Sequence, residues 1–115
     1  MSRAYKILAA REWEHALAAG VYEGSAIDLA DGFIHFSTAE QTPETAARHF
    51  RGREGLLLLE VETVALGSSL RWEPSRGGAL FPHLYGALPV SAVLEVHPFP
   101  LGQDGVPAAQ NVLRR

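Results

Sequence analysis

The sequence predicts a single α+β domain in which a mixed or split sheet is flanked by two main helices. Three observations lead to this prediction. Short apolar runs with the composition of strands occur at 4–9, 56–62 and 92–97. Two segments with the helical spacing of apolar residues lie between the first two runs. The 115 residues suit one domain with one core and are too few for two domains.

The composition limits the kinds of function that the chain can have. A hydrophobic content of 47% with 20% charged residues is typical of a folded globular protein and not of a disordered one. The net charge of -3 argues against general nucleic-acid binding, which needs a clustered basic surface. The absence of cysteine excludes disulfides, thiolate zinc sites and cysteine nucleophiles. Without a secretory leader pattern or an apolar run of about 20 residues, a cytoplasmic protein with no membrane span is expected.

The first part of the chain is expected to form a strand, a helix and a loop. The strand at 4–9 carries Lys6, which we expect on the solvent face of an edge strand because lysine is rarely buried. Residues 11–19 follow as a helix, with Trp13 as its anchor in the core. Residues 21–28 place Gly and Ser between apolar residues, which indicates a loop.

The stretch at 31–50 is expected to be a strand that leads into a helix. Within the strand at 33–37, alternation of side chains places His35 and Ser37 on one face, about 7 Å apart. An imidazole and a hydroxyl beside a helix start can bind a sugar diol or an anion. The alternative is that His35 is a structural histidine satisfied by Ser37 or by a backbone carbonyl.

Signals for the start of a helix follow this strand. Thr38 and Gln41 have the spacing of a capping box, and a proline suited to the first helical turn comes next. Arg48 lies off the apolar side of this helix, so it is either solvated or a source of positive charge for a ligand. The apolar stripe, which predicts close packing on the sheet, comprises Pro43, Ala46, Ala47 and Phe50.

The second half of the chain is less regular. Residues 64–67 and 70–73 are expected to form two short strands or one kinked strand, and 74–78 a flexible link. Prolines and glycines around 79–86 indicate a stiff loop. It carries the amphipathic rings of His83 and Tyr85 and could line a pocket. The alternative is a packed loop whose rings bond to the backbone. The composition from 101–115 predicts a poorly ordered tail.

Several reaction classes find no support in the motifs. Ser37 lacks the glycines of a G-x-S-x-G nucleophile elbow. His35, His83 and His97 lack the spacing of a metal site, so no metal is predicted. The dinucleotide fingerprint and the phosphate loop are both missing from the sequence.

Three ordered blocks resemble a bacterial family, domain of unknown function 952. These blocks are YKIL, then DGFIHFSTAEQ with TAARHF, then FPHLYGALP, and together they cover almost the whole chain. The resemblance implies the split mixed sheet of ADP-ribosyltransferase-like proteins. More remotely, the strand-then-helix text resembles the RNA 2'-phosphotransferases, which use NAD and belong to the same fold group.

The resemblance also implies roles for particular residues. In ADP-ribosyltransferase-like proteins the first strand offers a His or Arg to the nicotinamide-side ribose, and Lys6 lies in the matching block here, so this clamp is altered. His35 and Ser37 match the second-strand block. A catalytic Glu is expected near a late strand, for which Glu73 and Glu95 are the candidates.

We therefore expect a pocket for a nucleotide or ribose-type ligand, with NAD as a candidate cofactor, between 31–41 and 81–85. If the protein is an enzyme, it is expected to be a transferase or hydrolase acting at that ligand. Its alternatives are a non-catalytic module for a nucleotide or another anionic metabolite, and a protein-interaction domain that uses Phe81. The expected catalytic residues are His35, His83 and Glu73. The expected ligand-binding residues are Lys6, Ser37, Thr38, Gln41, Arg48, Arg76 and Tyr85.

Overall fold

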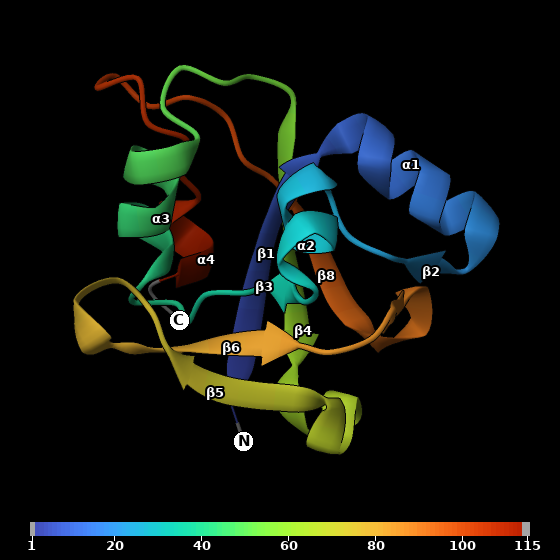
Figure 1. Ribbon diagram of the computed structural model, residues 1–115. Coiled ribbons are helices and arrows are strands. Elements are labelled where there is room, and N and C mark those ends of the chain that lie inside the picture. The colour runs from blue at the N-terminus through green and yellow to red at the C-terminus, as the bar shows by residue number, and fades with distance from the viewer. Residues whose placement is uncertain (1, 114–115) are drawn as a thin grey trace.

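Figure 1 shows a computed structural model of the protein, which describes residues 2–113 except for the side chains of Arg76, Gln110 and Asn111. The strands are β1 (Arg3–Ala9), β2 (Val21–Tyr22), β3 (Ile34–His35), β4 (Leu56–Glu62), β5 (Leu70–Pro74), β6 (Leu80–Leu84), β7 (Leu88–Pro89) and β8 (Val93–Pro98). The α-helices are α1 (Ala10–Ala19), α2 (Ala26–Asp31), α3 (Thr42–His49) and α4 (Gln110–Leu113). In this described part of the chain, no helix is long and apolar enough to cross a membrane.

The strands form two antiparallel sheets of three strands and one small pair. One sheet has the order β1-β4-β8, the other has the order β3-β6-β5, and β2 pairs with β7. In Figure 1, β5 and β6 run across the direction of β1 and β4. The two larger sheets meet where Ser37 pairs with Tyr5, through backbone hydrogen bonds of 2.8 and 2.9 Å. The chain leaving β3 therefore passes from one sheet to the other.

Pro82 explains why β3 pairs with β6 over such a short length. The Phe36 N–H donates to the Pro82 carbonyl over 3.0 Å. Proline has no N–H to return a second hydrogen bond, so the antiparallel pairing weakens at this residue. The next residue, Ser37, pairs with β1 instead. A proline inside β6 thus sets the point at which the chain changes sheets.

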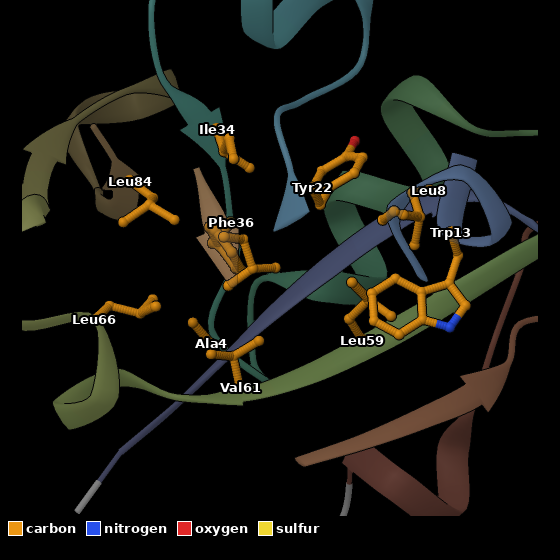
Figure 2. Close-up of a cluster of buried hydrophobic side chains, with 12 residues drawn as sticks. Ala4, Leu8, Trp13, Tyr22, Ile34, Phe36, Leu59, Val61, Leu66 and Leu84 are labelled. Atoms are coloured by element: carbon orange, nitrogen blue, oxygen red, sulfur yellow. The ribbon is translucent and has the colours of Figure 1, made fainter. Parts of the chain in front are cut away.

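Both faces of the β1-β4 pair are buried. Leu58 and Leu59 are successive residues with 0% exposure, and their side chains point to opposite faces. Figure 2 shows the cluster on one face, where Phe36 lies among side chains from β1, β4 and β6. The cluster on the other face includes Phe99 and Ala46, and α3 and α4 cover it (Figure 1). Burying each large apolar side chain contributes about 1.5–3 kcal/mol.

Much of the predicted secondary structure is confirmed. The strands at 4–9 and 56–62 are β1 and β4, and the helices at 11–19 and 42–50 are α1 and α3. The core position of Trp13 is also confirmed, since its residue exposure is 8%.

Four expectations about elements were wrong. Residues 21–28 contain β2 and the start of α2, and the predicted loop at 79–86 contains β6. Residues 64–67 lie in a 3-10 turn, so only 70–74 form a strand. Lys6 is not on the solvent face of an edge strand, because β1 lies between β4 and Ser37 and the residue is 5% exposed.

The segment from Leu101 onward also differs from the expected loose tail. Leu101 pairs with Pro107 in an isolated β-bridge. Val112 and Leu113, in α4, pack against the second hydrophobic cluster. Apolar contacts therefore hold this segment to the domain up to the last described residue.

Candidate functional site

One face of the β3-β6-β5 sheet carries a row of three side chains that can bear positive charge. His83 on β6 lies opposite His35 on β3 and opposite Arg71 on β5. Residues directly opposite in an antiparallel sheet project from the same face. The two imidazole rings meet edge to face, with centroids 5.7 Å apart. The sheet register thus fixes the spacing of all three groups.

Two aromatic side chains surround this row. The Phe33 ring stacks on His83 at a centroid distance of 4.1 Å and also lies 4.6 Å from His35. Tyr85 lies 5.3 Å from Phe33, and the Arg71 guanidinium sits over the Tyr85 ring at 4.7 Å. Such ring and cation-π contacts hold the imidazoles and the guanidinium in fixed positions.

Glu73 links His83 to Tyr85. Its Oε1 atom accepts hydrogen bonds from His83 Nδ1 and from the Tyr85 hydroxyl, each at 2.8 Å. The bond from His83, and after it the bond from Tyr85, lowers the pKa of Glu73. The hydrogen bond to the Glu73 carboxylate raises the pKa of Tyr85. Since Nδ1 donates to the carboxylate, Nε2 is the basic nitrogen of the neutral ring. Nε2 has no hydrogen-bond partner among the described residues.

The second histidine is held by a buried carboxylate. Asp28 in α2 is 1% exposed and accepts a hydrogen bond of 2.6 Å from His35 Nδ1. Its oxygens also accept bonds from Lys6 Nζ at 2.9 and 3.1 Å and from the Ser25 N–H at 2.9 Å. The Ser25 and Tyr22 hydroxyls donate to it over 3.1 and 3.5 Å. One carboxylate therefore connects β1, β2, α2 and β3.

These contacts decide the charge states around Asp28. Burial alone would raise the pKa of Asp28, but the bonds from His35, Lys6 and Ser25 outweigh it and lower that pKa below its usual range. Burial lowers the pKa of Lys6, and Asp28 opposes this effect. Burial, followed by the nearby Asp28 charge, raises the pKa of Tyr22. The carboxylate is thus kept ionised inside the domain.

His35 has a carboxylate on each side of its ring. Nδ1 faces Asp28, and Nε2 lies 2.9 Å from Asp31 Oδ2. The Asp31 side chain is 46% exposed, in contrast with that of Asp28. A ligand group arriving from solvent would therefore replace Asp31 and leave Asp28 in place.

The sequence comparison now identifies the family. Residues 7–96 match the family described as "Protein of unknown function (DUF952)". The chain belongs to the DUF952 family. This confirms the resemblance seen in the three sequence blocks.

Solved structures of one relative support the same assignment. The crystal structure of protein CC0527 from Caulobacter crescentus is 54% identical, with a TM-score of 0.96 over 99% of this chain and 100% of that one. A crystal structure of its double mutant is 53% identical, with the same TM-score and coverage. The solution NMR structure of CC0527 is 54% identical, with a TM-score of 0.87 over 97% of each chain. The comparison with curated proteins finds no match.

In this DUF952 protein, the structure brings together four of the residues that the sequence singled out. His35, His83, Glu73 and Tyr85 share the face described above. Lys6 lies beneath that face against Asp28 and is almost wholly buried.

The other predicted residues have different contacts. Ser37 is hydrogen-bonded to Thr45 at 3.0 Å. Thr38 and Gln41 bond to each other's backbone N–H groups at 3.0 and 3.1 Å, as a capping box does. Arg48 pairs with the exposed Glu44 one turn earlier on α3. The Arg76 side chain lies outside the described part of the chain. The last candidate, Glu95, lies on β8 beside His97.

Three residues in and beneath the face escaped the sequence analysis. Asp28 and Asp31 lie in α2, which the sequence did not predict, although the Ser-x-x-Asp spacing at 25–28 could have signalled a helix start. Arg71 could have been found from alternation alone, once β5 and β6 were known to be neighbours. Alternation along 33–37 already put Phe33 on the face of His35, and the structure adds its stacking on His83.

The expected cleft between 31–41 and 81–85 takes another form. β3 and β6 are adjacent, paired strands, so these segments form one surface and not two opposite walls. Cavities in the described part of the chain lie elsewhere. One of about 660 Å³ lies beside α3 and is lined by Ala47, Phe99 and Pro107 among others. The second, of about 430 Å³, lies beside α1 and includes Tyr22.

Proposed function

We propose that the face formed by His35, His83, Arg71 and Tyr85 binds a phosphate-bearing ribose or nucleotide and catalyses transfer or hydrolysis at that ligand. The observation that carries this proposal is the row of His35, His83 and Arg71 across three paired strands. Arginine forms two-pronged, charge-assisted hydrogen bonds with phosphate. Imidazole exchanges protons near neutral pH.

The roles within the row follow from the partners of each group. Arg71 lies on the exposed strand β5, and its guanidinium can bind a phosphate while it stays over the Tyr85 ring. His83 Nε2 is the basic nitrogen and can accept a proton from a hydroxyl or a water, while Glu73 stabilises the resulting imidazolium. His35 Nε2 lies 2.9 Å from the half-exposed Asp31 carboxylate and is the ring nitrogen that could contact a phosphate or sugar oxygen instead.

NAD is the cofactor that the family resemblance suggests, but the first strand does not fit it. The position expected to contact the nicotinamide-side ribose is Lys6, and its ammonium is buried against Asp28. The proposed chemistry therefore uses no step through NAD. Phosphorylated sugars, nucleoside phosphates and ADP-ribose are the better candidates, because they need only the phosphate and ribose contacts.

We extend the proposal to the fold class. In the described part of the chain, two three-stranded sheets are joined by the bridge between Tyr5 and Ser37, and this arrangement supports a split sheet of the ADP-ribosyltransferase-like kind. The strand pairs in the described part of the chain are all antiparallel, so the expected mixed sheet is not present there and the proposal keeps only the split arrangement. Function is argued from the site and not from this fold likeness.

A thermal-shift screen tests the binding step. Wild type, Arg71→Gln and the control Arg11→Gln would be screened against inorganic phosphate, ribose 5-phosphate, nucleoside monophosphates, ADP-ribose and NAD. A ligand that binds only the folded state raises the midpoint of thermal unfolding. We expect a shift with a phosphorylated ribose that is lost in Arg71→Gln and kept in Arg11→Gln. Equal shifts in all three proteins, or none in wild type, would remove the proposal.

A non-catalytic binding module is the second candidate, and one observation favours it. Both ring nitrogens of His35 face carboxylates, which hold the ring in place. This arrangement suits an imidazole that binds a ligand better than one that passes protons during a reaction. Turnover assays on each ligand found in the screen separate the two functions. Binding with no product formed, in wild type and in His35→Ala alike, would favour the module. The structure gives no support for a protein-interaction surface that uses Phe81, because this residue is only 7% exposed.

A further inference from the structure

A second cluster of polar side chains lies on the other three-stranded sheet, at the edge strand β8. Glu95 and His97 are two residues apart on β8, so both project from the same face of that strand. Glu60 on β4 lies directly opposite Glu95 in the strand register. One ligand-type atom from each of the three side chains lies within 4.8 Å of the other two. None of these residues takes part in the face that carries His35 and His83.

Within the cluster, His97 lies closer to Glu60 than to Glu95. His97 Nε2 lies 3.0 Å from Glu60 Oε1 and 3.9 Å from Glu95 Oε1. The other oxygen of Glu60, Oε2, accepts a hydrogen bond of 3.2 Å from Arg3 Nε. The side chains of Glu60 and His97 are 8% and 12% exposed, whereas that of Glu95 is 52% exposed. Two of the three side chains are therefore largely buried, and the cluster meets solvent at Glu95.

The backbone around the cluster is irregular. The register between β4 and β8 shifts between Glu60 and Val61, so that Val61 pairs with Val93 and Leu94 is passed over. Such a bulge changes the direction of nearby side chains and is frequent beside functional sites. Two carboxylates directly opposite each other in a sheet repel. Arg3 already offsets part of this repulsion at Glu60, and a cation bound between Glu60 and Glu95 would offset it further.

We propose that Glu60, Glu95 and His97 bind a divalent transition-metal ion, for which Zn²⁺ is the test ion. Tetrahedral zinc with bonds of about 2.0–2.2 Å holds its nitrogen and oxygen ligands about 3.3–3.5 Å apart. The separations of 3.0 and 3.9 Å from His97 Nε2 lie on either side of this range. Binding would require His97 Nε2 to move away from Glu60 Oε1 and toward Glu95 Oε1, each by a few tenths of an ångström.

The ligand set also selects the kind of metal. One imidazole with two carboxylates suits zinc and its neighbours in the first transition series better than Mg²⁺ or Ca²⁺, which prefer oxygen alone. Arg3 would hold Glu60 from outside the coordination sphere, as outer hydrogen-bond partners of metal ligands commonly do. Three protein ligands leave a fourth position for water on the open side, next to Glu95.

Isothermal titration of chelator-treated protein with Zn²⁺ tests the proposal. We expect one saturable site in wild type and at least a tenfold loss of affinity in His97→Ala. Glu95→Gln should show a similar loss, and its exposed position keeps the variant folded. Glu14→Gln, an exposed carboxylate on α1, is the matched control and should bind as wild type does. Mg²⁺ in excess should not compete with Zn²⁺.

Each remaining outcome overturns the metal site. Wild type without a saturable Zn²⁺ site would show that Glu60, His97 and Arg3 form an ion-pair cluster only. Zinc binding that survives in both His97→Ala and Glu95→Gln would place the ion elsewhere, and loss of that binding in His35→Ala would move it to the face with His35 and His83.

Discussion

His35 and His83 lie directly opposite each other on β3 and β6, with ring centroids 5.7 Å apart, and each is hydrogen-bonded through Nδ1 to a carboxylate. The two carboxylates differ. That of Asp28 is almost wholly buried, whereas 33% of the Glu73 side chain is exposed. His35 is therefore bonded to a carboxylate in the interior and His83 to one at the surface, although the His83 side chain, at 7% exposure, is itself more buried than that of His35, at 35%. This difference leads to the predictions that follow.

Replacing Asp28 should destabilise the protein more than replacing any exposed carboxylate. Asp28→Asn leaves the buried Lys6 ammonium without its charge partner, and breaking a buried pair in this way costs about 3–5 kcal/mol. Asp31→Asn, whose side chain is 46% exposed, should cost less than about 1 kcal/mol. Urea unfolding of the two variants gives both values. An Asp28→Asn variant within about 1 kcal/mol of wild type would contradict the buried-charge interpretation.

Acid should weaken the fold through the same carboxylate. Because the folded state lowers the pKa of Asp28, its contribution to stability is present above the ordinary carboxyl pKa of about 4 and is lost as pH falls toward the folded-state pKa. We expect the thermal midpoint of wild type to fall steeply below about pH 4 and that of Asp28→Asn to fall less. Equal slopes for the two proteins would show that Asp28 is not the group responsible.

The phenol of Tyr85 should ionise at a higher pH than that of a free tyrosine. Its hydrogen bond to Glu73 favours the neutral phenol and raises its pKa. In Glu73→Gln the negative charge is gone, so the pKa of Tyr85 should fall back toward the ordinary value. Ultraviolet titration of tyrosinate, with Tyr85→Phe to assign the signal, measures the change. An unaltered Tyr85 midpoint in Glu73→Gln would be inconsistent with this hydrogen bond.

A methyl group at Gly24 should be poorly tolerated. Gly24 has a φ of +114°, and a Cβ there would lie 2.8 Å from the Asp28 Cβ. Gly52 also has a positive φ, of +78°, but nothing lies within 4 Å of its added Cβ. Gly52→Ala should lower the free energy of unfolding by about 1–3 kcal/mol, through backbone strain alone. Gly24→Ala should lower it by more, because the clash with Asp28 adds to the same strain. Equal losses by urea unfolding would show that the packing at Asp28 is loose.

The sequence predicted those parts of this fold that depend on local patterns. β1, α1, α3 and β4 follow from apolar spacing over seven to ten residues. The capping box of Thr38 and Gln41 is also local, and its two hydrogen bonds are present. Alternation placed His35 and Ser37 on one face of a strand at 33–37. His35 does lie on a sheet face, against His83, but β3 ends at His35 and Ser37 is buried where it pairs with Tyr5 on β1.

The errors come from contacts between distant parts of the chain. Lys6 is buried because Asp28, 22 residues later, neutralises it, and no local rule shows that pairing. α2 has only six residues, too few to show a helical period. β6 contains Pro82, which normally argues against an interior strand. Proline is accepted here because the strand opposite moves away to pair with β1 at that point.

Chemical-shift mapping by ¹H–¹⁵N NMR with ribose 5-phosphate or ADP-ribose tests the central claim most directly. The proposal predicts that the perturbed amides cluster on β3, β5 and β6, around His35, Arg71 and His83. It also predicts that Arg71→Gln raises the dissociation constant obtained from the titration at least tenfold, as expected when a charge-assisted hydrogen bond is lost. Perturbations confined to the cavity beside α3, or none at saturating ligand, would contradict the assignment of this face as the ligand site.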